Sequence, residues 1–364
     1  MKSTSKKRSR SKKVQKRTGI GKGAIAGIVV AVLLFLALIG TLMLILHDNA
    51  KDFVSEYEKT HYRKSLYKAE TFASQLCVTD ADVAMEGYTQ DASLHAVGLF
   101  DVQGKNVLYA DQIFEPLYPA STTKIMTALL TLENLNLSQV VTIKHDITFP
   151  DGAAVAIHLK KGDKITVEAL LNALIIMSAN DAAVALGEAV AGSEVNFVKM
   201  MNKRAKELGA TNTHFANPNG LHLSNHYSTA YDLYLIFKEV AKHNEFFNIA
   251  GRSSSRIEYL GSKGEQKIYD MASTNQYIAG TYTLPSQVYM IGGKTGTTTQ
   301  AGSCLILLTK NKDGEEFISV VLKGVTKSAL YHTMTDILTE IIACKQIEIE
   351  LQKAAISKEM LINN

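Results

Sequence analysis

The chain has 364 residues, of which 46% are hydrophobic and 20% charged, so it can bury one large core or two modest ones. This composition excludes intrinsic disorder as the default interpretation. The formal net charge is +4, but residues 1–22 hold ten of the 39 Lys and Arg and no Asp or Glu, which leaves the rest of the chain mildly acidic.

The start of the chain has the pattern of a membrane topology signal. A basic tail at residues 1–23 is followed by an uncharged apolar run at residues 24–46. As a helix this run would be about 34 Å long, enough to cross the roughly 30 Å core of a bilayer. Because Lys and Arg collect on the cytoplasmic side, we expect a cytoplasmic tail, a single-pass transmembrane helix and an extracytoplasmic domain, rather than a nucleic-acid partner. A cleavable signal peptide is the alternative, although its apolar region would be only about 7 to 15 residues.

Residues 47–92 are rich in charge and Tyr and show no strong core pattern, so we predict an extracytoplasmic spacer there. The folded domain is predicted at residues 93–342, and a C-terminal helical extension at residues 343–364. The cysteines at 77, 304 and 344 are odd in number and lack metal-ligand spacing, so they predict neither a disulfide framework nor a zinc site.

Inside the folded domain, the apolar pattern changes from strands to helices and back to strands. Residues 96–102 and 106–110 predict a hairpin around Gln103-Gly104. Apolar stripes at helical spacing follow, at residues 125–132, 167–177, 182–190 and 195–208. Strand-like runs then lie at residues 287–295, 304–309 and 317–322, and an amphipathic helix lies at 327–342. This order predicts an α+β architecture, with a five-stranded antiparallel sheet covered by helices and a helical subdomain.

The first motif with chemical potential is Pro119-Ala120-Ser121-Thr122-Thr123-Lys124, which is predicted to open a helix. Ser121 and Lys124 are three residues apart, so a helix would place them on one face. A serine hydroxyl needs a base to become a nucleophile, and a lysine can serve if burial and a nearby cation lower its pKa. The helix N-terminus would add N–H groups for a developing oxyanion.

The second motif is Ser178-Ala179-Asn180, a polar break between two apolar helices. Helix capping by Asn180 or Asp181 is the structural explanation, but it accounts less well for Ser178. In a serine acyl transferase without histidine, a second hydroxyl can relay a proton to the leaving amine, while an amide holds the substrate and the lysine.

The third motif is Gly292-Gly293-Lys294-Thr295-Gly296-Thr297-Thr298, at the end of a strand-like run. Glycine weakens a strand and often marks the close approach of another backbone, such as an extended peptide substrate. Lys294 and the hydroxyls of Thr295 and Thr297 could hold a carboxylate, and Lys294 would help to keep Lys124 neutral.

The three motifs occur together and in this order, and the chain thereby resembles the penicillin-binding proteins and serine β-lactamases. Within that group it resembles the low-molecular-weight D-alanyl-D-alanine carboxypeptidases of the S11 peptidase family. The resemblance covers about residues 94–342. The stretches that carry it are PASTTKIMTALLTLEN, LLNALIIMSANDAAVALGEAVAGS, FVKMMNKRAKELGATNTHFANPNGLH, YSTAYDL and IGGKTGTTTQAGSCLILL.

The resemblance implies the transpeptidase fold of these proteins and a cofactor-free acyl transfer on peptidoglycan stem peptides that end in D-Ala-D-Ala, with β-lactam antibiotics as covalent inhibitors. Ser121 would be the acylated nucleophile and Lys124 its base, with Ser178 and Asn180 as proton relay and amide contact. The oxyanion hole would be the N–H groups of Ser121 and Thr297. The implied substrate-binding residues are Lys294, Thr295, Gly296 and Thr297.

Three departures from the family pattern limit this transfer of roles. Thr297 stands where several relatives carry histidine, so the rate and its pH dependence stay open. The closing helix begins Thr326-Lys327 and lacks the arginine with which many relatives bind the substrate carboxylate. Only 22 residues follow position 342, too few for the C-terminal β-domain and anchor common in the family, and the N-terminal helix would replace that anchor.

The same residues support three other functions less well. Class A β-lactamases use a glutamate between the second and third motifs to activate water, and the comparable stretch at residues 215–220 has none. A catalytically silent wall-binding or penicillin-sensing protein would not need the complete set of catalytic residues. A metal site would need a third ligand beside His222 and His226, which lie in a loop-like context without an acidic partner.

Overall fold

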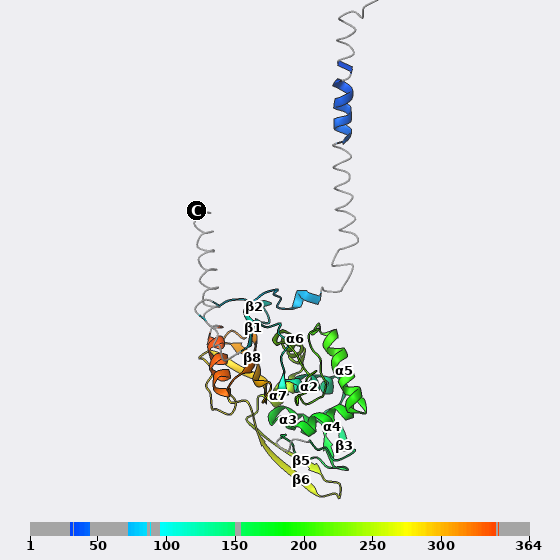
Figure 1. The fold of residues 1–364 in the computed structure, drawn as a ribbon, viewed down its shortest axis with the longest axis vertical. Coiled ribbons are helices and arrows are strands. Elements are labelled where there is room, and N and C mark those ends of the chain that lie inside the picture. Colours follow the sequence, from blue (N-terminus) through cyan, green and yellow to red (C-terminus); the bar gives the residue numbers. More distant parts are fainter. Residues whose placement is uncertain are drawn as a thin grey trace, which may run out of the picture. The chain divides into compact units, whose positions relative to one another are not determined.

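The computed structural model describes residues 30–31, 33–43, 72–85, 88, 95–149, 154–339 and 341 (Figure 1). The chain divides into two units, residues 1–71 and 72–364. In the first unit, residues 30–31 and 33–43 are helical and exposed. No helix within these described residues is both long and apolar enough to span a membrane. Residues 24–29, 32 and 44–46 of the predicted anchor lie outside the described residues, as do the basic tail and the C-terminal extension at 343–364.

A five-stranded antiparallel sheet forms the centre of the second unit, as predicted, with the order β2-β1-β9-β8-β7. Its strands are β1 (Ala96–Asp101), β2 (Asn106–Asp111), β7 (Val288–Thr298), β8 (Gly302–Asn311) and β9 (Glu316–Gly324). Strand β7 lies at the edge of this sheet, and Lys294 pairs with Ile306 of β8. The third motif therefore lies along an open sheet edge.

The sheet is buried on both faces, because alternate residues of its inner strands enter two different cores. Along β8, Cys304, Ile306 and Leu308 pack into one core, whereas Leu305 and Leu307 pack into the other. The first core is shared with the main group of helices, and the second with a helix at residues 327–339 (Figure 1). Strands buried on both faces are close to continuously apolar, and this is why their sequences were recognisable.

The first four helices of the main group match the predicted apolar stripes, and two more helices follow for which no stripe was predicted. The main group comprises α2 (Lys124–Asn134), α3 (Val167–Ile176), α4 (Asn180–Ala191), α5 (Glu194–Glu207), α6 (Ala230–Val240) and α7 (Asn244–Ala250). A short 3-10 helix, η2 (Ala120–Thr123), leads directly into α2. The first motif is thus a tight turn followed by a helix, not a helix from its first residue.

A second, four-stranded sheet was not predicted. Its order is β3-β4-β5-β6, with β3 (Val140–Thr142), β4 (Lys164–Thr166), β5 (Ser254–Leu260) and β6 (Gln266–Ala272). Two of these strands have only three residues. The other two form a long hairpin at one end of the unit (Figure 1), where one face is exposed and largely polar. The apolar signal that reveals a strand is therefore weak, and β3 and β4 were overlooked between the first two predicted helical stripes.

The folded unit also begins earlier than predicted. Residues 72–85 belong to it, starting with η1 (Phe72–Gln75). Cys77 is buried, and its N–H donates to the Tyr234 hydroxyl at 2.9 Å. Val83 and Ala110 exchange backbone hydrogen bonds of 2.8 and 3.0 Å. Residues 72–85 of the predicted spacer at 47–92 therefore belong to the folded unit.

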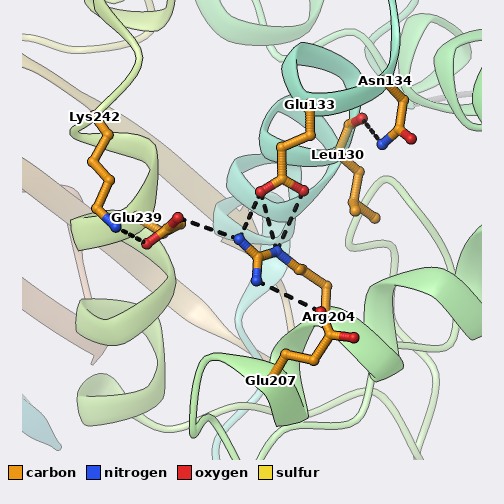
Figure 2. Close-up of polar contacts among 7 residues, drawn as sticks. All are labelled: Leu130, Glu133, Asn134, Arg204, Glu207, Glu239 and Lys242. Atoms are coloured by element: carbon orange, nitrogen blue, oxygen red, sulfur yellow. Dashed lines mark hydrogen bonds and ion pairs between the residues drawn. The ribbon is translucent and has the colours of Figure 1, made fainter. Parts of the chain in front are cut away.

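A network of ion pairs lies at the C-terminal end of α2 (Figure 2). Lys124 is at the opposite end of the same helix. Arg204 of α5 reaches Glu133 of α2 with its Nη2 at 2.7 Å from Oε1, and reaches Glu239 of α6 at 3.2 Å. Lys242 pairs with the same Glu239 at 2.6 Å. Three helices are therefore joined at one guanidinium, whose fork can serve two carboxylates at once.

Candidate active site

The 3-10 helix η2 carries the predicted nucleophile Ser121 and is named the nucleophile turn. It places the hydroxyl of Ser121 beside the amine of Lys124. Ser121 Oγ and Lys124 Nζ are 3.0 Å apart, as the i, i+3 spacing predicted. Ala120 just before has φ +48, a conformation that costs free energy for a residue other than glycine. Neither η2 nor α2 has a side-chain N-cap, so contacts from elsewhere in the fold must hold this turn.

Lys124 is fully buried and its amine has three oxygen neighbours. Its Nζ donates to Asn180 Oδ1 at 2.9 Å and to the carbonyl of Asn219 at 2.5 Å. The orientation of the Asn180 amide is fixed, since its Nδ2 donates to the Val155 carbonyl at 3.0 Å. A neutral amine has two hydrogens and one lone pair, so both hydrogens go to these two acceptors. The lone pair then faces the Ser121 hydroxyl, which is the arrangement a general base needs.

The environment of Lys124 favours this neutral form. Burial lowers the pKa of Lys124 well below its usual value, and the nearby Lys294 lowers it further, while Asp181 opposes the shift. Asp181 lies behind the site, where its carboxylate accepts the N–H groups of Ile157 and Leu159 at 3.1 and 3.0 Å. Asp181 also accepts the N–H of Ala182 in the first turn of α4 at 3.0 Å, although Ala179 is the N-cap residue. It therefore serves the start of this helix and also holds another segment.

Ser178 lies in the break between α3 and α4, where the sequence indicated a polar interruption. Its φ is +68, in the left-handed region that non-glycine residues rarely adopt. Lys294 Nζ donates to Ser178 Oγ at 3.0 Å, so the second and third motifs are in direct contact. Strain at a polar residue with a defined partner is typical of an active site.

On β7, Lys294 is buried, and burial lowers its pKa to about 7. Its Nζ also donates to the Thr295 carbonyl at 2.9 Å. The hydroxyl of Thr295 lies 2.6 Å from that of Thr274, a residue that the sequence analysis did not select. A substrate carboxylate arriving here would favour the charged form of Lys294 and raise its pKa again.

Gly296 allows β7 to approach the nucleophile turn. A Cβ atom at this position would lie 2.8 Å from the backbone nitrogen of Ser121 and 3.1 Å from the Pro119 carbonyl, so a side chain would not fit. Thr297 follows and lines the cleft. The backbone around Ser121 and Thr297 thus lies close together, as an oxyanion hole made from their two N–H groups requires.

A cleft of about 240 Å³ opens over these residues. All the predicted site residues line it except Lys124 and Lys294, which lie beneath it and reach Ser121 and Ser178 with their amines. No Asp or Glu is among the described residues that line the cleft. Lys327, at the start of the closing helix, is part of its wall.

The sequence analysis missed the segment Asn217-Pro218-Asn219-Gly220 as part of the site and considered it only for its lack of glutamate. Its Asn219 carbonyl binds the amine of Lys124, and the Pro218 carbonyl accepts the Thr127 hydroxyl at 2.6 Å. Backbone carbonyls carry no residue-type signal. The available clue was the compact turn composition of the segment itself.

Comparisons with known proteins agree with this geometry. The sequence profile of the peptidase S11 family, described as D-alanyl-D-alanine carboxypeptidase, matches residues 83–326. The D-alanyl-D-alanine carboxypeptidase DacF of Bacillus subtilis is 38% identical over 223 residues, and DacC of Escherichia coli is 32% identical over 250 residues. These matches cover 60% and 66% of this chain but only 54% and 59% of the relatives.

Solved structures show the same fold. A mutant of the DD-transpeptidase of Streptomyces K15 superimposes with a TM-score of 0.63 at 28% identity, over 70% of this chain and all of that one. Penicillin-binding protein D2 of Listeria monocytogenes, solved in a cefotaxime-bound form, gives a TM-score of 0.57 at 27% identity, over 70% of this chain and 98% of that one. With the family profile matched over most of the folded unit, the chain belongs to the D-alanyl-D-alanine carboxypeptidase family, peptidase S11.

Proposed function

We propose that the protein is a serine-type D-alanyl-D-alanine carboxypeptidase that removes the terminal D-Ala from peptidoglycan stem peptides. The observation that carries this proposal is the 3.0 Å contact between Ser121 Oγ and the buried amine of Lys124, whose two other acceptors leave its lone pair for the hydroxyl. The curated relatives named as such carboxypeptidases support the substrate class.

In the proposed first step, Lys124 accepts the proton of Ser121, and Ser121 Oγ bonds to the carbonyl carbon between the two D-alanines. The N–H groups of Ser121 and Thr297 stabilise the oxyanion. When the C–N bond breaks, the leaving amine gains a proton through Ser178, and free D-Ala departs. Water then cleaves the Ser121 ester, which restores the hydroxyl and releases the shortened stem.

The terminal carboxylate of the substrate would bind beside Lys294 and the hydroxyl of Thr295. Lys327 adds a second cation at the wall of the cleft, although the family arginine is absent from this helix. An ammonium attracts a carboxylate as a point charge and lacks the two-pronged geometry of a guanidinium. Recognition of this carboxylate therefore depends mainly on the residues of β7.

The activity is tested by incubating the full chain with a peptide that ends in D-Ala-D-Ala. We expect release of free D-Ala and a product lighter by one alanine, and neither should appear with Ser121→Ala. A protein that binds the peptide without releasing D-Ala would be a silent wall-binding protein. Cleavage at another bond, identified from the product mass, would replace carboxypeptidase with endopeptidase activity.

We further infer that the protein is a single-pass protein of the cell membrane, anchored by residues 24–46 with the basic tail in the cytoplasm and the catalytic domain outside. The charge of the tail and the length of the apolar run support this. Protease added to intact cells should therefore digest the domain and leave the tail protected. Digestion of the tail with the domain spared would reverse the orientation, and the absence of the tail from mature protein would indicate a cleaved signal peptide.

A further inference from the structure

A buried histidine below the nucleophile turn has no part in the mechanism above. His226 is only 2% exposed, and it lies at the end of the loop of residues 216–226. Its Nδ1 lies 3.1 Å from the backbone nitrogen of Ala216, and its Nε2 lies 2.8 Å from Oγ1 of Thr123. Thr123 directly precedes Lys124 in the chain, so His226 contacts the residue next to the proposed base.

The two contacts determine where the proton of the imidazole lies. A backbone N–H can only donate, so Nδ1 must accept from Ala216 with its lone pair. In the neutral ring the proton is then on Nε2, which donates to the Thr123 hydroxyl. Burial lowers the pKa of His226 to about 4, so the ring is neutral at pH 7.

The loop that His226 closes is also the loop that holds Lys124. The Asn219 carbonyl accepts from Lys124 Nζ, and the Asn217 side chain accepts the N–H of Gly220 at 2.7 Å. Gly220 has φ +83, and a Cβ there would lie 1.9 Å from the Ala120 carbonyl, so the loop backbone touches the strained turn. His226 lies at the end of this loop and accepts a hydrogen bond from Ala216 at its start. Its other ring nitrogen contacts Thr123, so both ends of the loop are tied to the nucleophile turn.

We propose that His226 is a positioning residue for acylation, which acts through the Thr123 hydroxyl to hold Ser121 and Lys124 in line. This inference rests on the proposed acyl transfer. The turn has no side-chain cap of its own and contains Ala120 at positive φ, so it depends on outside contacts for its geometry. A misplacement of the order of 1 Å between nucleophile and base can cost about 10²-fold in rate.

Two substitutions of the histidine separate its two contacts. His226→Asn keeps an acceptor near the position of Nδ1 for Ala216 but offers no donor to Thr123. His226→Gln can place an amide N–H near the position of Nε2 but loses the acceptor for Ala216. We expect the acylation rate constant of the full chain with a fluorescent penicillin to fall about 10- to 100-fold in His226→Asn. It should stay within about threefold of wild type in His226→Gln, while the dissociation constant of the non-covalent complex changes little in both.

Two variants of Thr123 test the same hydrogen bond from its other partner. They test the proposal even if the histidine variants do not fold. Thr123→Val keeps the shape and removes the acceptor, so it should lose as much as His226→Asn, whereas Thr123→Ser should retain the rate. The double variant His226→Asn with Thr123→Val should be no slower than either alone, because one interaction cannot be removed twice.

The proposal is overturned if His226→Asn or Thr123→Val acylates at more than half the wild-type rate. It is also overturned if the Asn and Gln variants lose rate equally and in proportion to their melting temperatures, since that pattern would show a merely structural histidine. Failure of the proposed function would look different, because wild type itself would then form no adduct at Ser121.

Discussion

Replacing Lys124 with arginine should reduce acylation of Ser121 by about 10²- to 10⁴-fold, the contribution of a well-placed general base. Arginine keeps the positive charge but stays protonated, so it has no lone pair for the Ser121 hydroxyl. Lys124→Met should lose about as much, because it keeps the neutral, buried shape without the amine. The measurement is the second-order rate of adduct formation with a fluorescent penicillin, with folding checked by circular dichroism.

The pair of substitutions distinguishes two roles for the lysine. If the site needed only a positive charge, arginine would retain activity and methionine would not. If both variants acylate near the normal rate, the base is another group, with Ser178 first in line. The control is Lys161→Arg, a substitution of an exposed lysine, which should leave the acylation rate unchanged.

The pH dependence should follow from the same lysine. Its folded-state pKa is lowered, so the neutral base persists at pH values well below the usual range for lysine. Acylation should therefore fall on the acidic side as Lys124 gains its proton. Burial lowers the pKa of Lys294 to about 7, and the charged form of Lys294 pushes the pKa of Lys124 further down.

The parts of the fold that were predictable carry strong local patterns. The strands β8 and β9 are nearly continuous apolar runs, and the i, i+3 spacing of Ser121 and Lys124 directly implied their contact. The contact between Lys294 and Ser178 spans 116 positions and could be expected only from the order of the three motifs. The resemblance to a known family, not the local sequence, placed these two residues in one site.

The parts that were not predictable depend on partners rather than on residue type. The Asn219 carbonyl could belong to any residue, and its position under Lys124 follows from the path of the loop. His226 looks in the sequence like any solvated histidine, and only its burial against Thr123 and Ala216 shows otherwise. The four-stranded sheet was not predicted, because β5 and β6 expose a polar face and bury few apolar residues.

Penicillin should form a long-lived covalent adduct on Ser121 and block D-Ala release for as long as the adduct persists. Its strained lactam resembles the D-Ala-D-Ala carbonyl, and its carboxylate can reach Lys294 and Thr295. After ring opening the leaving nitrogen stays tethered and obstructs water. The described lining of the cleft has no Asp or Glu to activate that water, so hydrolysis should be slower than acylation by at least about 10²-fold.

Intact-mass spectrometry should therefore show one added penicillin on wild type and none on Ser121→Ala. The exposed serine variant Ser224→Ala is the control, and it should carry the adduct like wild type. Rapid turnover of penicillin without an adduct in stopped-flow and mass measurements would contradict this expectation. The protein would then be a β-lactamase whose water is activated by a group other than a cleft carboxylate, and Lys124 would be the first residue to examine.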